Sequence, residues 1–189
     1  MLKTLVATIA ALGISAPSMA APSYLNRQHT RLWNTLESAG VSVHLNPSSL
    51  CNKPDAPMGI YVYDQRYGSL IGICQDNRTP TGEQVAWSDN DLDTLRHEAM
   101  HFIQDCVDYR IDGRLSPYFD GTGPSPGTLT HQDVIERLGL TRALNIAYSY
   151  QERGADRLTI QLEHEAFAIA AYAQADQISD KIRQVCPRK

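Results

Sequence analysis

The sequence predicts an α+β fold, in which a small antiparallel sheet precedes a helical C-terminal part. Hydrophobic residues alternate along 41–45, as they do in a strand with one buried face. Two further strand-like segments, 59–64 and 69–75, are separated by four residues that suit a hairpin turn. Residues 92–106 and most of 131–185 instead have the hydrophobic spacing of amphipathic helices.

The first twenty residues have the pattern of a secretory signal peptide. Lys3 supplies the positive start, 5–14 the apolar stretch, and 18–20 the small residues required for cleavage after Ala20. The apolar stretch is too short to span a membrane comfortably, and we expect no membrane span in the mature chain. Residues 21–189 are therefore expected to form one exported domain, either periplasmic or secreted.

The net charge argues against a nucleic-acid-binding protein, and the cysteines indicate disulfides. The formal net charge is -4 and basic residues are not clustered, so we expect no nucleic-acid partner. The even number of cysteines in an exported chain predicts two disulfides. Three pairings are possible, and we favour Cys51–Cys74 with Cys106–Cys186, because each pair ties a loop or terminus to a regular element. The oligomeric state is not indicated.

The other segments were interpreted from local signals. Residues 24–39 are expected to form a helix that ends at Gly40 and carries His29 at the surface. Residues 83–87 could add a further strand, whereas 109–130 are rich in Gly and Pro and predict an irregular loop. The C-terminal helices are expected at 131–138, 141–153, 155–173 and 177–185.

The chemistry is concentrated in the helix predicted over 92–106. Residues four apart lie on the same face of a helix, so His97 and His101 can bind one metal ion together. Glu98 lies about a quarter-turn from His97, where it can reach a metal-bound water without binding the metal. The hydrophobic stripe of this helix is separate, so one face is available for the core and another for chemistry.

The segment His97-Glu98-x-x-His101 resembles the zinc-binding signature of the zincin metallopeptidases. The resemblance implies a zincin-like fold with one Zn²⁺ ion held by the two histidines, and with Glu98 as the general base. It also implies a peptide or protein as the substrate. In zincins an edge strand pairs with the extended substrate, and 69–75 or 83–87 could take that role here.

A catalytic zinc ion usually has three protein ligands and one open position. Gln104 and Val107 stand where the metzincin subclass requires glycine and histidine, which excludes that subclass. The segment 162–168 resembles the E-x-E-A segment of gluzincin-like peptidases, and this resemblance implies Glu165 as the third ligand. The helical geometry agrees, because Glu165 shares a face with the apolar residues and Glu163 lies about 200° away. The alternatives are Glu163, His164 and Glu152.

The sequence therefore predicts an exported zinc-dependent metallopeptidase that hydrolyses peptide bonds. The alternative is an exported, non-catalytic binding or structural domain whose metal site is vestigial or structural. The substrate and the cleavage preference are not indicated. Neither is the donor that stabilises the transition state, for which the candidates are Tyr109, Tyr148, Tyr150 and His131.

Overall fold

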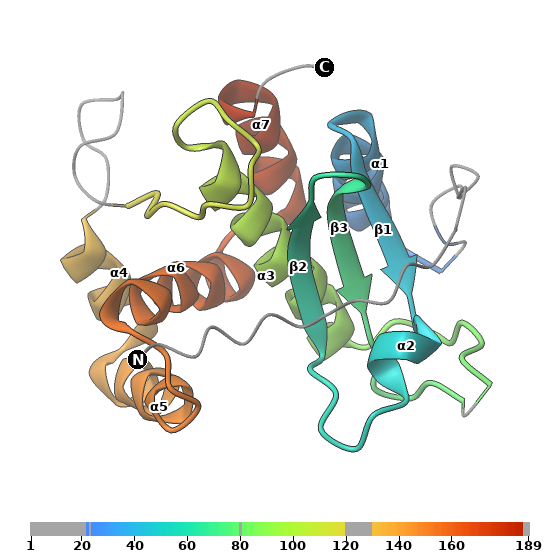
Figure 1. Ribbon diagram of the computed structural model, residues 1–189, viewed down its shortest axis with the longest axis horizontal. Coiled ribbons are helices and arrows are strands. Elements are labelled where there is room, and N and C mark those ends of the chain that lie inside the picture. Colours follow the sequence, from blue (N-terminus) through green and yellow to red (C-terminus); the bar gives the residue numbers. More distant parts are fainter. Residues whose placement is uncertain (1–21, 23, 80, 120–129, 187–189) are drawn as a thin grey trace.

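The computed structural model describes residues 22, 24–79, 81–119 and 130–186 (Figure 1). The predicted signal peptide lies outside these residues. Within them the chain forms seven helices and three strands, which confirms the α+β class. None of the described helices has both the length and the apolar composition needed to cross a bilayer. The elements are α1 (Arg27–Ser38), β1 (Val41–Leu45), α2 (Ser48–Cys51), β2 (Gly59–Asp64), β3 (Gly68–Ile73), α3 (Asp89–Cys106), α4 (His131–Leu138), α5 (Leu140–Gln151), α6 (Arg157–Tyr172) and α7 (Ala175–Val185).

The sheet is mixed, so the prediction of an antiparallel sheet was wrong for one of its two pairings. The strand order is β1-β3-β2, and the hairpin between β2 and β3 is antiparallel as expected. β1 runs parallel to β3, with Val43 opposite Ile71, because the chain crosses over through α2 and β2 before it returns beside β1. β3 is therefore central, and β2 is an edge strand of this sheet.

Helix α3 occupies the middle of the molecule. It packs against β2 and β3 on one side and against α6 and α7 on the other (Figure 1). Its buried stripe, which includes Leu95, Phe102 and Ile103, contributes to one continuous hydrophobic core. The same core receives residues from α1, from the sheet and from α7: Leu32, Trp33, Leu36, Val41, Val43, Ile71, Ile73, Ile178 and Ile182.

The first turn of α3 is fixed by a capping box. The side chain of Ser88 accepts a hydrogen bond from the Asp91 backbone N–H, and the Asp91 carboxylate accepts one from the Ser88 N–H. Asp91 is fully buried and also accepts from the Asp76 backbone N–H, at 2.9 Å. The N-cap is therefore Ser88, and Asp91 ties the start of α3 to the segment that follows β3.

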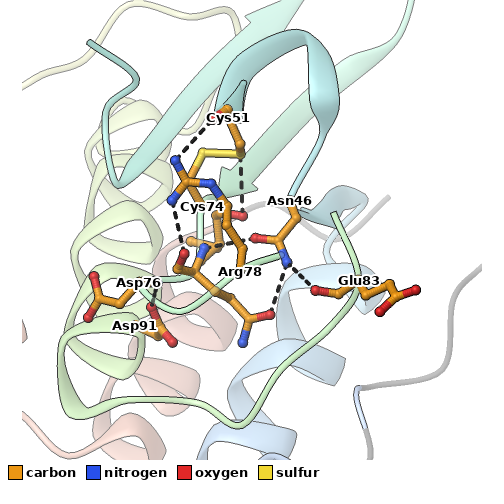
Figure 2. Close-up of a disulfide and its surroundings, with 9 residues drawn as sticks. Asn46, Cys51, Cys74, Asp76, Arg78, Glu83 and Asp91 are labelled. Atoms are coloured by element: carbon orange, nitrogen blue, oxygen red, sulfur yellow. Dashed lines mark hydrogen bonds between the residues drawn. A yellow bond between two sulfur atoms is a disulfide. The ribbon is translucent and has the colours of Figure 1, made fainter. Parts of the chain in front are cut away.

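Side chains rather than a strand hold the segment between β3 and α3 (Figure 2). Asn46 has a φ of 48°, in the left-handed region that asparagine tolerates better than most residues. Its amide nitrogen donates to the Gln75 side chain and to the Glu83 carbonyl, and its oxygen accepts from the Gln75 N–H. Arg78 donates to the carbonyls of Cys51 and Gln75. The strand predicted at 83–87 is consequently absent from this described segment.

The two predicted disulfides are both confirmed. Cys51–Cys74 joins the end of α2 to the residue after β3, and Cys106–Cys186 joins the last residue of α3 to the end of α7. The second bridge closes a loop with a sequence separation of 80, which in the chain-entropy account stabilises the fold by about 4 kcal/mol. The C-terminal helix is thus fixed to the end of the helix that carries the two histidines.

His29 is buried between α1 and α3, so the expectation that it lies at the surface was wrong. Its Nδ1 lies 2.8 Å from Oδ1 of Asn26, and its Nε2 lies 2.8 Å from Nη1 of Arg96. A guanidinium nitrogen can only donate, so Nε2 must accept and the ring must be neutral. Burial, and then the charge of Arg96, lower the pKa of His29 to about 4 against the opposing effect of Asp176.

This lowered pKa predicts that the fold loses stability in mild acid. Because the unfolded ring has a pKa of about 6.5, the unfolded state binds more protons between about pH 6.5 and pH 4, and stability falls as the pH falls through that window. We expect the variant His29→Gln, which keeps an acceptor for Arg96 but cannot titrate, to be less sensitive. The difference in unfolding free energy between about pH 7 and pH 4.5 should shrink by up to about 2 kcal/mol, measured by urea unfolding. An equal pH dependence in both proteins would contradict this assignment.

Candidate metal centre

Helix α3 presents His97 and His101 on the face that meets α6. The two Nε2 atoms lie 3.1 Å apart, and the ring centroids are 4.8 Å apart. Both side chains are largely buried, and the ring of His97 also packs against Phe167 on α6. The one-turn spacing has therefore brought the two imidazoles together as the sequence predicted.

The carboxylate beside these rings belongs to Glu163. Its Oε2 lies 3.2 Å from Nε2 of His97, and its Oε1 lies 3.6 Å from Nε2 of His101. One ligand atom from each of the three residues lies within 4.8 Å of the other two, so the group could hold a metal ion. The structure thus assembles the two predicted histidines with Glu163, which the sequence analysis had kept as an alternative.

Glu165, the predicted third ligand, points elsewhere. Its side chain is fully buried, and its carboxylate accepts hydrogen bonds from Nε2 of Gln104 and from the backbone N–H groups of Tyr118 and Phe119, at 2.9 to 3.0 Å. The α6 carboxylate that lies with the two histidines is therefore Glu163, and Glu165 is not part of that group. The physical reason is the angle of about 200° between residues two apart on a helix, which sends the two carboxylates to different surroundings.

The three groups have complementary protonation tendencies. The pKa of His101 is lowered to about 4 by burial and by the neighbouring His97. Burial also acts to lower the pKa of His97, but the carboxylates of Glu163 and Glu98 outweigh it and hold this pKa above its usual value. Burial acts to raise the pKa of Glu163, and the two histidines reverse that effect and lower it. Without a metal, the Glu163 carboxylate therefore faces one neutral ring and one ring, His97, whose protonation it favours, and a zinc ion would have to displace that proton to use both imidazoles as ligands.

The spacing of these atoms is close to that of ligands around a tetrahedral cation. Two ligands at about 2.0–2.2 Å from a tetrahedral zinc ion lie about 3.3–3.6 Å apart. The observed separations are 3.1 Å between the two Nε2 atoms, 3.2 Å from Oε2 of Glu163 to His97 and 3.6 Å from its Oε1 to His101, which lie at or slightly below this range and use both carboxylate oxygens. Oε2 of Glu163 is buried and faces Nε2 of His97 at 3.2 Å. A bound cation would take the place of the His97 proton between this oxygen and the ring.

Glu98 lies beside this group but is not part of it. Its carboxylate is buried against the start of β2, where a Cβ atom added to Gly59 would lie 2.5 Å from Oε1 of Glu98. Burial raises the pKa of Glu98 to about 7, with His97 opposing and Glu163 adding to the shift, while a hydrogen bond from the Tyr61 backbone lowers it. The predicted general base is therefore held between the histidine pair and the backbone of an edge strand.

Of the four candidate donors, the structure brings Tyr150 to the site. Burial, and then the charges of Glu163 and Glu98, raise the pKa of Tyr150, so its hydroxyl stays protonated. Tyr109 and Tyr148 are exposed, and His131 instead stacks on His164 with ring centroids 5.4 Å apart.

Sequence reasoning missed two residues that shape the site. Gly59 gives Glu98 room beside β2, and Gln104 contacts Nδ1 of His101 at 2.7 Å. Gln104 had been considered only as a departure from the metzincin pattern. The available signal was its position three residues after His101, which places an amide one helical turn from a ligand.

We predict that Glu163→Ala weakens zinc binding by on the order of 100-fold or more, because the group of His97, His101 and Glu163 loses its carboxylate. Binding would be measured at equilibrium by competition with a chromogenic chelator. Glu152→Ala is the matched control, since Glu152 was an alternative ligand and lies exposed at the end of α5. Unchanged affinity in Glu163→Ala, or a comparable loss in Glu152→Ala, would contradict the assignment.

Comparison with known proteins gave no further constraint on this site. No protein-family model, no curated protein and no solved structure matches the chain. The resemblance to zincins therefore depends on the residues of α3 themselves.

Proposed function

We propose that this chain is an exported zinc-dependent metallopeptidase with a gluzincin-like ligand set. The observation that carries the proposal is the meeting of His97 and His101 with a carboxylate from a later helix, at separations that suit one tetrahedral ion. Glu98 lies beside the group without belonging to it, as a general base requires. Export is supported by the two disulfides, which persist in oxidising compartments, together with the predicted signal peptide.

In the proposed hydrolysis, Glu98 and Tyr150 have different roles beside the metal site. A bound zinc ion supplies positive charge that polarises a water molecule and the substrate carbonyl. Glu98 accepts the proton of the water as its oxygen attacks the carbonyl carbon, and then donates that proton to the amine as the C–N bond breaks. The Tyr150 hydroxyl, which remains protonated, is the group beside Glu163 that can donate to the negative charge developing on the carbonyl oxygen.

The edge strand β2 is the candidate for substrate pairing. In zincins an edge strand lines the cleft, and the sequence analysis had considered 69–75 or 83–87 for this role. β3 is central in the sheet, and 83–87 is not a strand, so neither segment offers a free edge. β2 lies at the edge of the sheet and contacts Glu98 through Gly59, which favours an extended peptide bound along it.

We expect Glu98→Gln to retain zinc and to lower the rate of hydrolysis by about 100-fold to 10,000-fold, the usual contribution of a general base. Hydrolysis would be measured on a quenched-fluorescence peptide library with and without a chelator, and zinc by elemental analysis of the dialysed protein. A wild-type protein that binds zinc but cleaves no peptide would support the alternative of a non-catalytic domain. Wild-type turnover in Glu98→Gln would remove this residue from the mechanism.

Gly59→Ala is expected to lower kcat while leaving KM largely unchanged. The added methyl group would meet Glu98 Oε1 at 2.5 Å and Thr94 Cγ2 at 2.6 Å, so the base must move. A displacement of a reacting group by about 1 Å can cost up to about 100-fold in rate. Gly72→Ala is the matched control, because its methyl group would meet Leu50 Cδ2 at 2.9 Å, Ile60 Cγ2 at 3.2 Å and Pro47 Cγ at 3.6 Å, and none of the candidate site residues. Equal effects of the two substitutions on kcat would argue against a positional role for Gly59.

A further inference from the structure

Gln104 connects a candidate metal ligand to the interior of the protein. It lies on α3 one turn beyond His101, and its side chain is fully buried. Its Oε1 is 2.7 Å from Nδ1 of His101, while its Nε2 donates to the Leu162 carbonyl at 3.0 Å and to Oε2 of Glu165 at 2.9 Å. A single amide therefore bridges the imidazole and helix α6.

The orientation of this amide follows from its partners. A backbone carbonyl can only accept a hydrogen bond, so the NH₂ group of Gln104 must face Leu162 and its oxygen must face His101. An amide oxygen can only accept, so the hydrogen of the neutral imidazole must lie on Nδ1. A neutral imidazole carries one N–H, and Nε2 of His101 is therefore left with its lone pair.

Glu165 reinforces this orientation from the other side. The backbone N–H groups of Tyr118 and Phe119 can only donate, and both donate to the Glu165 carboxylate. That carboxylate gives the NH₂ group of Gln104 a second acceptor, so both amide hydrogens are used. Rotating the amide by half a turn would bring its oxygen against two acceptors at once, with no donor for either.

We propose that Gln104 and Glu165 are positioning residues that fix the tautomer of His101 and so direct its Nε2 lone pair into the group formed with His97 and Glu163. The inference rests on the proposed metal site, because only a ligand atom benefits from a lone pair held there. A histidine that binds metal through one nitrogen commonly donates the other N–H to an acceptor, which fixes the ring. Here the acceptor is an amide whose own orientation is set by a buried carboxylate. The predicted ligand Glu165 thus acts on the site through Gln104.

The test is the tautomer of His101 in the metal-free protein. Two-bond ¹H–¹⁵N correlation spectra distinguish an imidazole protonated on Nδ1 from one protonated on Nε2. We expect the Nδ1–H form in the wild-type protein and its loss in Gln104→Met, which preserves the shape but offers no acceptor. Gln75→Met is the matched control, because Gln75 is also fully buried, donates to the Val85 carbonyl and accepts from Asn46. That control should retain the Nδ1–H form.

A second variant separates orientation from folding. Gln104→Glu keeps an acceptor for His101 but removes the donor to Leu162 and Glu165, so we expect lower stability with the Nδ1–H form retained. Zinc affinity, measured by chelator competition, should fall by about 10-fold to 100-fold in Gln104→Met and less in Gln104→Glu. The proposal is overturned if wild-type His101 carries its hydrogen on Nε2, or if Gln104→Met leaves both tautomer and affinity unchanged. Absence of peptide hydrolysis would count against the proposed function alone, because the spectra are recorded without metal.

Discussion

The contact between α3 and α6 buries two imidazoles against one carboxylate, and much of the structure serves to hold that contact. Buried polar atoms without partners cost about 1–3 kcal/mol each, so an arrangement of this kind persists only where packing and other bonds enforce it. Both ends of α3 are fixed. Ser88 and Asp91 cap its first turn, and the Cys106–Cys186 disulfide joins its last residue to α7. The helix therefore cannot rotate to move the histidines away from α6.

A second set of buried carboxylates fixes the segment that leaves α3. Asp105 is fully buried and accepts hydrogen bonds from the Tyr61 hydroxyl and from the backbone N–H groups of Asp112 and Gly113. The carboxylate of Glu165 likewise accepts hydrogen bonds from the backbone N–H groups of residues 118 and 119. These bonds give an irregular, Gly-rich and Pro-rich segment the backbone partners that a helix or strand would otherwise provide. The Tyr61 contact also ties this segment to the edge strand beside Glu98.

The sequence was sufficient for features that depend on local spacing. Hydrophobic periodicity located the three strands and the main helices, although the strand expected at 83–87 is absent. The four-residue spacing of His97 and His101 predicted their convergence, and the pairing of the cysteines was correct. It failed for the parallel pairing of β1 with β3, because the direction of a strand depends on how the chain crosses over and not on side-chain alternation. It also failed for His29, whose burial is made possible by Asn26 and by Arg96 from a distant helix.

The apolar residues of α6 were not sufficient to predict which of its carboxylates lies beside the histidines. The expectation for Glu165 treated the apolar residues of the helix predicted over 155–173, among them Leu158, Leu162 and Tyr172, as one buried face. Leu158 and Tyr172 are in fact exposed, and α6 contacts α3, α4 and α5 on different sides. When a helix is buried on several sides, the face of its apolar residues does not identify which neighbour each polar residue meets. Glu165 matched the sequence pattern of the third ligand, whereas Glu163 is the residue whose carboxylate lies beside His97 and His101.

This geometry has a consequence for how the proposed metal would act on the fold. The candidate ligands come from α3 and α6, which are separated in the chain by α4 and α5. An ion bound by all three ligands would join the two helices through His97, His101 and Glu163, whereas Cys106–Cys186 joins the end of α3 to α7. Because such a site does not exist in the unfolded chain, the free energy of binding would add to the free energy of folding. The α3–α6 contact would then depend on the ion for stability and, at the same atoms, for the proposed chemistry.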